Sequence, residues 1–225
     1  MEFQVNFKVN ASIYVKNPET SELGRQIVKH AIDLIYSLGF EHFTIKKLAQ
    51  DIGTTEATVY RYFENKHRIL LYILNWYWSY MEFLMDYKLQ NIASDKEKLK
   101  IVVDILTSEL PESSGIFEYN KKALNEIVIA ESSKVYLTKE VSEINKHEVF
   151  KPYKDLCSKI SNVIREYNPN YQYPKSLSTT IVEVVHQQQF FGQNLPRLTD
   201  IQENNTATNR FTNQFILDLV LKVLG

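Results

Sequence analysis

The sequence predicts an all-α protein of about nine helices, and three observations support this fold class. Apolar residues recur at spacings of three and four along most of the 225-residue chain. Short polar links that contain proline, glycine or asparagine separate these apolar segments. The alternation typical of a strand occurs only in residues 3–15, and no second segment offers a partner strand. Helices joined by short links, without strand pairs, form an all-α architecture.

Composition places the chain among globular proteins with one core or two small ones. Hydrophobic residues make up 44% of the chain and aromatic residues 12%, which suffices to bury a core. The single cysteine, Cys157, cannot form an internal disulfide and suits a reducing cytosol. Because it lies on an apolar helical face, we expect a core residue rather than a redox sensor. The net charge of −1 gives no indication of nucleic-acid binding.

Residues 1–19 are expected to form an N-terminal arm of unassigned role. Their alternation of Phe and Val with polar residues has a strand period. Two interpretations stay open: the arm packs on the domain that follows, or it is a flexible tail. Asn17-Pro18 ends the segment, and Thr20 or Ser21 then caps the first helix, with Glu22 suited to its positive start.

Residues 44–66, TIKKLAQDIGTTEATVYRYFENK, are the most informative segment. A first short helix is expected from Thr44, which caps it, to Ile52. Gly53 stands where that helix must stop, because a left-handed conformation carries no steric cost for glycine. Thr54 and Thr55 then offer a second N-cap, and the next helix runs through Tyr62.

The spacing of Ala49, Gly53 and Val59 is typical of a helix-turn-helix unit. Such a unit needs a small residue where its helices cross, a turn residue, and a branched side chain that packs between the helices. Its purpose is to place the second helix in the major groove of DNA.

Extended back to Thr20, the segment that ends at Lys66 resembles the DNA-binding domain of TetR/AcrR-family transcriptional regulators. The matching features are Ala31, Gly39-Phe40, Thr44, Leu48-Ala49, Gly53, Thr58-Val59-Tyr60, Tyr62-Phe63 and Asn65-Lys66. The resemblance implies a three-helix DNA-binding head on an all-α body that binds an effector and dimerises. It implies a domain order of arm (1–19), helix-turn-helix domain (20–66), and effector-binding and dimerisation domain (67–225).

The start of the second helix of the motif is expected to face base edges. Glu56 can accept from cytosine, Ala57 can contact a thymine methyl, and Arg61 can bind guanine. The resemblance implies that the hydroxyls of Thr44, Thr58, Tyr60 and Tyr62 and the ammonium of Lys66 contact phosphates. The alternatives are caps for Thr44 and Thr55, packing for the tyrosines, a solvated charge for Glu56 and a plain surface lysine. The predicted DNA-binding set is Thr44, Thr54, Thr55, Glu56, Ala57, Thr58, Tyr60, Arg61, Tyr62 and Lys66.

Residues 69–87 are apolar enough to raise the possibility of a membrane span. Nineteen helical residues cover roughly 28 Å, close to a bilayer core. Asn75, Glu82 and Asp86 interrupt the segment, so a buried helix is the better interpretation and no membrane partner is expected. The helices expected after the motif are 66–90, 96–110, 117–130, 134–146, 148–167, 174–191 and 207–224.

Helices 174–191 and 207–224 are rich in Ile, Val, Leu and Phe. The resemblance implies that such a terminal pair forms a four-helix bundle with its symmetry mate. A twofold interface needs one self-complementary apolar patch, and these helices can supply it. The alternative is that they pack only on their own body.

The aromatic residues of the body suggest a cavity for a small effector. The resemblance implies an apolar ligand in this region, with ordinary core packing as the alternative. His186 would be a polar handle or a hydrogen-bonded core histidine. The predicted pocket residues are Trp76, Tyr80, Phe83, Phe117, Tyr136, Phe150, Tyr153 and His186.

No catalytic or metal-binding constellation is found in the sequence. His147-Glu148 begins like a metalloprotease helix, but Lys151 stands where the second histidine is needed. We therefore expect no enzyme, cofactor or metal, and a cytoplasmic location. The predicted function is a homodimeric, sequence-specific DNA-binding repressor, released from a palindromic operator by a small apolar or amphipathic effector. The alternative is an architectural or partner-regulated DNA-binding protein without an effector.

Overall fold

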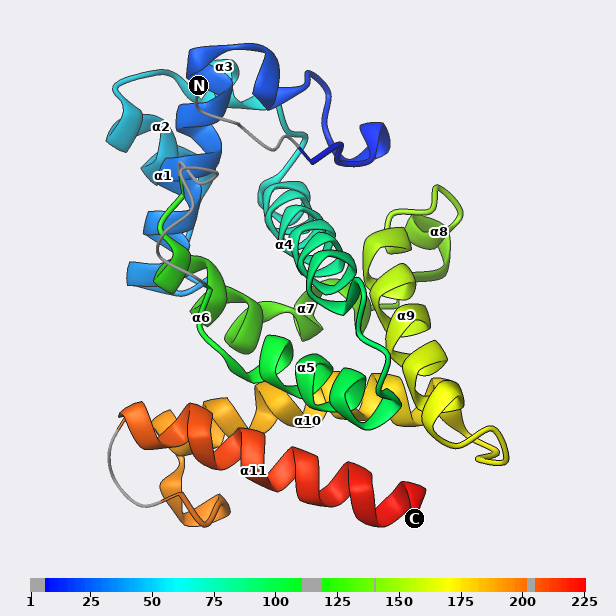
Figure 1. Cartoon of the computed structure of the whole chain (residues 1–225). Coiled ribbons are helices and arrows are strands. Elements are labelled where there is room, and N and C mark those ends of the chain that lie inside the picture. The colour runs from blue at the N-terminus through cyan, green and yellow to red at the C-terminus, as the bar shows by residue number, and fades with distance from the viewer. Residues whose placement is uncertain (1–6, 111–118, 140, 202–204) are drawn as a thin grey trace. The chain divides into compact units, whose positions relative to one another are not determined.

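The computed structural model describes residues 7–110, 119–139, 141–201 and 205–225 (Figure 1). Within these ranges all regular secondary structure is helical and there is no strand, so the predicted fold class is confirmed. The helices are α1 (Glu22–Leu38), α2 (Ile45–Ile52), α3 (Glu56–Tyr60), α4 (Lys66–Leu89), α5 (Asp95–Thr107), α6 (Lys121–Glu131), α7 (Ser133–Tyr136), α8 (Val141–Asn145), α9 (Lys151–Tyr167), α10 (Pro174–Asn194) and α11 (Asn205–Leu224), with 3-10 turns η1 (Ala11–Ile13), η2 (Pro18–Thr20) and η3 (Pro196–Leu198).

The chain forms two compact units. Unit 1 comprises the chain up to Trp78 together with Leu110–Lys151, and unit 2 comprises Ser79–Glu109 and Pro152–Gly225. Unit 1 thus holds more than the predicted domain 20–66, because the first half of α4 and the segment α6–α8 belong to it as well.

The strand-like alternation in residues 3–15 produces no strand in the described part of that segment. Residues 11–13 form the 3-10 turn η1, because the side chain of Asn10 accepts from the Ser12 amide and no partner strand is available. Asn17 caps η2 in the same way. The segment nevertheless packs on unit 1, since Val9 and Ile13 are buried. Of the two interpretations, the described residues favour the packed arm.

The predicted helix ends around the motif are confirmed by the hydrogen bonds of their caps. Ser21 Oγ accepts from the Gly24 amide, and Thr44 Oγ1 accepts from the Lys47 amide. Thr55, not Thr54, caps α3 by accepting from the Thr58 amide. Gly53 has a left-handed backbone with φ of 74°, which lets α2 end and α3 begin within three residues.

Two predicted helices are shorter than expected. The expected helix 134–146 divides into α7 and α8, because Leu137 leaves the helical conformation and is 78% exposed. Helix α3 ends at Tyr60 rather than running through Tyr62, and a turn joins the Tyr62 amide to the Val59 carbonyl. Phe117 lies outside the described residues, so the expected start of the helix 117–130 does too.

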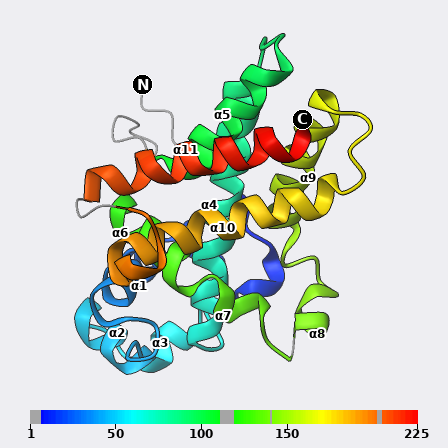
Figure 2. The same cartoon turned by 90° about the horizontal axis from the view of Figure 1, so that it is seen from below.

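Unit 2 is built on the packing of α10 against α11, which run side by side in both views, with α5 against α11 (Figure 2). Ile181 and Val185 of α10 and Ile216 and Val220 of α11 are buried. Cys157 of α9 is buried too, as expected, and burial raises the pKa of its thiol to about 11. None of the described helices is long and apolar enough to cross a bilayer.

The burial of His186 in unit 2 predicts a stability that depends on pH. Burial lowers the pKa of its imidazole from 6.5 to about 4, while Glu183 opposes this shift. The unfolded chain therefore binds more protons than the folded chain between these values, and stability falls as pH drops below 6.5. At pH 5 the loss relative to pH 7 from this residue should be about 2 kcal/mol.

The measurement is urea unfolding of the wild type and of His186→Phe between pH 7.5 and 4.5. As the pH falls, the free energy of unfolding of the wild type should decrease more than that of the His186→Phe variant. A difference that stays constant over this range would show that His186 does not carry the pH dependence.

Candidate nucleic-acid interface

Helix α3 presents two chemically distinct faces. Its inner face is fixed by Val59, which has no exposed surface, and by Tyr62 and Phe63 just after it, which are buried. Leu48 and Ala49 of α2 are buried as well, as the crossing of two short helices requires. The outer side carries exposed residues at the start of the helix and one turn further on, namely Thr55, Glu56, Ala57, Tyr60 and Arg61.

This exposed group contains the side chains that the sequence predicted to face bases. Glu56, Ala57 and Arg61 are all exposed. Thr55 and Thr58 are joined by their hydroxyls at 2.9 Å, so part of their hydrogen-bonding capacity serves the cap of α3. Thr54 is half-buried, and its amide donates to the Ala49 carbonyl at 2.8 Å. The interface residues stay a prediction, and the geometry leaves the outer side of α3 open.

Tyr62 differs from the other predicted contacts because only 4% of its surface is exposed. Its hydroxyl lies 2.8 Å from Ser21 Oγ, and the ammonium of Lys16 lies 3.4 Å away. The hydrogen bond with Ser21, supported by Lys16, lowers the pKa of the phenol below its usual range. This geometry favours the packing alternative for the ring, while its hydroxyl joins the start of α1 to the motif.

Lys66 binds the protein's own backbone. Its ammonium donates to the carbonyls of Phe40, Glu41 and Phe43 at 3.0, 3.2 and 3.3 Å. It also lies 4.6 Å from the centroid of the Phe40 ring, within the range of a cation–π contact. Three carbonyl partners occupy the three donors of an ammonium. The geometry therefore gives Lys66 the task of holding the segment between α1 and α2, where the sequence suggested a phosphate contact.

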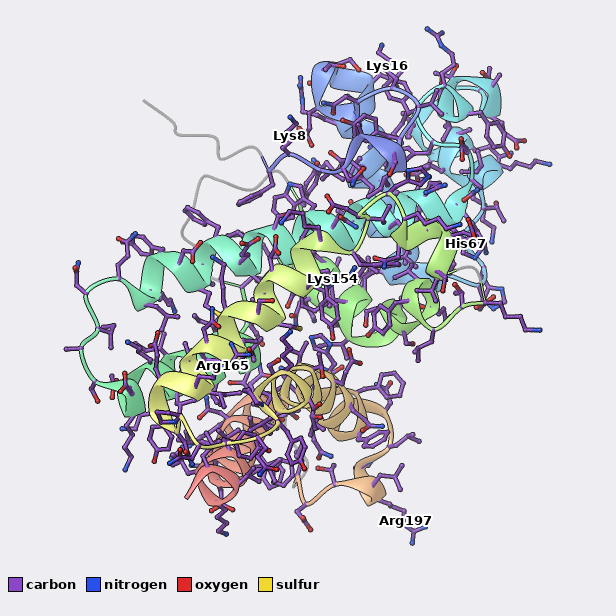
Figure 3. All side chains as sticks on the ribbon, turned by 90° about the vertical axis from the view of Figure 1, so that its right-hand side faces the viewer. Lys8, Lys16, His67, Lys154, Arg165 and Arg197 are labelled. Carbon is purple, nitrogen blue, oxygen red and sulfur yellow. The ribbon has the colours of Figure 1, made fainter. Side chains whose placement is uncertain are left out.

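The structure adds a cation that sequence reasoning missed. Lys16, on the N-terminal segment drawn in Figure 3, lies over the ring of Tyr62 at 5.1 Å. The backbone next to Lys16 is held in place because the Val15 amide donates to the Tyr62 carbonyl at 2.8 Å. Lys46 of α2 and Arg61 are exposed in the same domain. No local sequence pattern links Lys16 to the motif, because the two are more than forty residues apart.

The predicted effector residues fall in both units. Trp76, Tyr136 and Phe150 belong to unit 1, whereas Tyr80, Phe83, Tyr153 and His186 belong to unit 2. Phe117 lies outside the described residues. Trp76 is buried and meets the rings of Phe7 and Tyr119 edge-on at 5.4 and 5.2 Å. Phe83 is 40% exposed. The effector pocket stays a prediction.

The fold and the open face of α3 define the class of an all-α helix-turn-helix protein. Comparison with known proteins narrows this class. Residues 27–73 match the sequence profile of the family described as "Bacterial regulatory proteins, tetR family". Residues 27–73 are therefore similar to the DNA-binding segment of this family.

One curated relative is the fatty acid metabolism regulator protein of Bacillus subtilis (strain 168), which is 30% identical over 78 residues. The match covers 35% of this chain and 40% of that protein's length. It therefore concerns less than half of the relative.

Solved structures share the fold over most of the chain. FadR from Bacillus subtilis in complex with stearoyl-CoA has a TM-score of 0.62 at 18% identity, covering 89% of this chain and 99% of its own. FadR from Bacillus halodurans has a TM-score of 0.59 at 19% identity, with coverages of 86% and 97%. AibR in complex with isovaleryl coenzyme A and operator DNA has a TM-score of 0.59 at 16% identity, with coverages of 87% and 96%.

The contacts of Lys66 predict a loss of stability when its ammonium is removed. Lys66→Met keeps much of the aliphatic stem but leaves three carbonyls and the Phe40 ring without their cation. Hydrogen bonds to a charged group contribute about 1.5–3 kcal/mol each, shared here within one cluster. We expect the free energy of unfolding to fall by about 2 kcal/mol, measured by urea denaturation. Lys46→Met, at an exposed position of α2, is the matched control and should change stability little. Equal effects of the two substitutions would contradict the structural role of Lys66.

Proposed function

We propose that the protein is a sequence-specific DNA-binding transcriptional regulator. The observation that carries this proposal is the open outer side of α3, held on a buried base by Val59 and Phe63. A short rigid helix with exposed donors and acceptors at its start is what insertion into the major groove requires. The match of residues 27–73 to the TetR-family profile supports the same function.

The chemistry of the exposed residues suggests how DNA would be read. Arg61 can bind the O6 and N7 of guanine in a bidentate manner, and Glu56 can accept from the N4 of cytosine. Tyr60, which is 46% exposed, carries a hydroxyl suited to a phosphate. Lys16 and Lys46 would add phosphate contacts from the N-terminal segment and from α2.

An amphipathic effector is the second part of the proposal. The structural relatives include one protein bound to stearoyl-CoA and one bound to isovaleryl coenzyme A together with operator DNA. These ligands support an acyl thioester as the class of effector. Release from DNA by the effector, which makes the protein a repressor, is a separate part of the proposal and does not rest on these complexes. The sequence indicates no catalytic constellation, and the proposed place of action is the cytoplasm, where the DNA lies.

Dimerisation through α10 and α11 is the third part of the proposal. One side of α11 is buried within unit 2 through Ile216, Val220 and Leu224. A second apolar stripe, spaced by four residues, retains exposed surface and consists of Phe211, Phe215, Leu219 and Val223. Phe211 and Phe215 stack with ring centroids 6.3 Å apart. A stripe of this kind suits an isologous helix pair about a twofold axis.

The DNA-binding proposal predicts distinct effects for base and phosphate contacts. Sites selected by the full-length protein from a random DNA pool should be near-palindromic. Arg61→Ala should weaken binding to the selected site by about 1–3 kcal/mol and relax selection at one base pair. Tyr60→Phe should weaken binding evenly across sequences, because it loses only a phosphate contact. Titrations by fluorescence anisotropy measure both effects.

Arg165→Ala, which removes an arginine from α9, is the matched control and should bind as the wild type does. Adding stearoyl-CoA to the complex tests release. Selection that yields no enriched palindrome would overturn the DNA-binding proposal. A selected complex that stearoyl-CoA leaves intact would overturn the proposed effector class alone.

The dimer proposal predicts that a charge on the second stripe of α11 separates the protomers. Phe215→Lys places an ammonium in the proposed apolar interface, where an unpaired charge is strongly unfavourable. The variant should sediment as a monomer under conditions in which the wild type sediments as a dimer. Gln214→Lys adds the same charge at the neighbouring exposed position and should leave the dimer intact. Dissociation by both variants, or by neither, would remove the stripe from the interface.

A further inference from the structure

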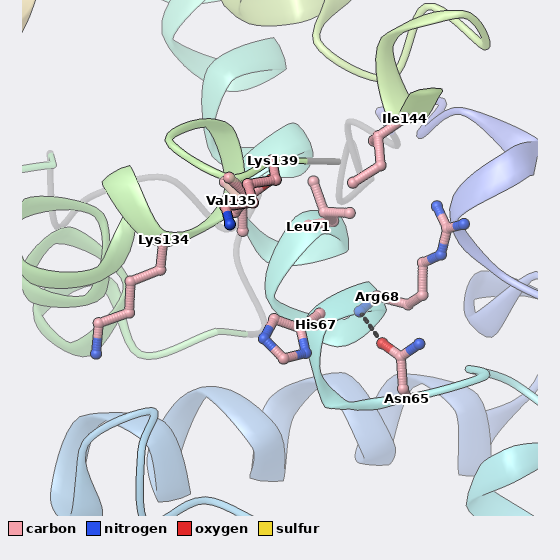
Figure 4. A pocket seen from close by; sticks show the side chains of 9 residues that line it. Asn65, His67, Arg68, Leu71, Lys134, Val135, Lys139 and Ile144 are labelled. Atoms are coloured by element: carbon pink, nitrogen blue, oxygen red, sulfur yellow. Dashed lines mark hydrogen bonds between the residues drawn. The ribbon is translucent and has the colours of Figure 1, made fainter. Parts of the chain in front are cut away.

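Unit 1 contains a pocket of about 400 Å³ next to the first turns of α4 and the segment that carries α7 and α8 (Figure 4). None of the residues predicted from the sequence to hold an effector lines it. Its volume is in the range of small-ligand sites, and it takes no part in the outer side of α3. The chemistry of the residues that line the pocket determines which class of ligand it can bind.

The charge of the wall is positive. Arg68 and Lys139 line the pocket, and among its described lining residues there is no carboxylate. Arg68 meets Glu64 at 3.5 Å, but one side-on contact leaves most of the donors of a guanidinium available. Lys134 is not counted, because Figure 4 shows its ammonium pointing away from the other labelled side chains, and it pairs with Glu41 and Glu131.

The rest of the wall is mixed, because Asn65 and His67 are polar and three other residues are apolar. Leu71 and Val135 are buried and, with Ile144, provide a surface for an aliphatic chain. Thr138 also lines the pocket, and its hydroxyl oxygen is buried without a hydrogen-bond partner among the described residues. A buried hydroxyl is normally paired, so this oxygen is a position where a polar atom of a ligand would be bound.

We propose that this pocket binds an amphipathic anion, with its phosphate or similar head at Arg68 and its aliphatic part on Leu71, Val135 and Ile144. Lys139, whose ammonium lies on the other side of Leu71 in Figure 4, adds to the positive charge of the wall. The Thr138 hydroxyl would contact the polar atoms that join head and chain. The pocket itself does not depend on the proposed function. Only the further step, that its ligand acts as an effector, rests on that proposal.

The wall of the pocket is continuous with the contacts that hold the DNA-binding motif. Val135 lines the pocket, and the preceding residue of α7, Lys134, binds Glu41 at 2.9 Å in the segment before α2. A ligand that shifts α7 would therefore act directly on this ion pair. A ligand in the pocket could therefore affect the position of the helix-turn-helix motif through contacts that lie within unit 1.

Calorimetric titration of the DNA-free, full-length protein with octyl phosphate tests the pocket. The wild type should bind octyl phosphate. It should bind inorganic phosphate, octanol and octyltrimethylammonium at least about tenfold more weakly, because each lacks one of the two features or has the wrong charge. Arg68→Gln with Lys139→Gln should weaken octyl phosphate binding at least about tenfold. Thr138→Val should weaken it several-fold.

The matched control is Lys88→Gln with Lys175→Gln, which removes two exposed positive charges from unit 2 and should leave the affinity unchanged. Thermal unfolding verifies that each variant is folded. Octyltrimethylammonium binding as tightly as octyl phosphate would overturn the proposal, as would equal losses in the two double variants. Because no DNA is present, these outcomes stay separate from the DNA selection, which tests the proposed function by itself.

Discussion

The arrangement of unit 1 depends on the contacts around Phe40, in the segment that joins α1 to α2. The Phe40 side chain is buried, and its amide donates to Glu131 Oε1 at 3.1 Å. Lys66 binds three carbonyls of the same segment, and Lys134 links Glu131 to Glu41. Buried polar groups of this kind are tolerable only when all of them are paired. The segment has therefore one favourable position, and α2 begins directly after it at Thr44.

This cluster joins three elements that lie far apart in sequence. Lys66 opens α4, Glu131 ends α6 and Lys134 lies in α7. A movement of α6 or α7 must either carry the segment with it or separate the nearly buried Glu131 carboxylate from the Phe40 amide and from Lys134. Coupling between a ligand and DNA requires two arrangements with different affinities for both. The Phe40 cluster is a place where unit 1 could differ between such arrangements, because Lys134 and Glu41 are exposed enough to exchange each other for water.

Local features of the fold were predictable from the sequence, and long-range pairings were not. Ser21, Thr44 and Thr55 could be identified as caps, and Gly53 as a helix end, because each acts on residues within four positions. The contacts of Lys66 and Glu131 join residues 26 and 91 positions apart, and no local pattern encodes them. The alternation of residues 3–15 yields no strand for a related reason: a strand needs a partner, and Asn10 caps a 3-10 turn in that segment instead. Helical spacing identified aromatic residues of the body, but could not show that Trp76 would meet Phe7 and Tyr119.

A near-neutral chain can bind DNA only if its cations are placed accurately. With a net charge of −1, no long-range attraction draws the whole protein to DNA, so the binding energy must come from individual contacts. Lys16, Lys46 and Arg61 belong to three different elements, and Lys16 reaches the motif only because the N-terminal segment packs on Tyr62. Lys66, a fourth cation of the motif, is used to fix backbone geometry. A rigid scaffold can therefore compensate for a low net charge. Because Lys66 already orders the backbone, less conformational entropy is lost when the other cations bind phosphates. The proposed twofold dimer would double these few contacts, which would make the apolar stripe of α11 as important for affinity as the residues of α3.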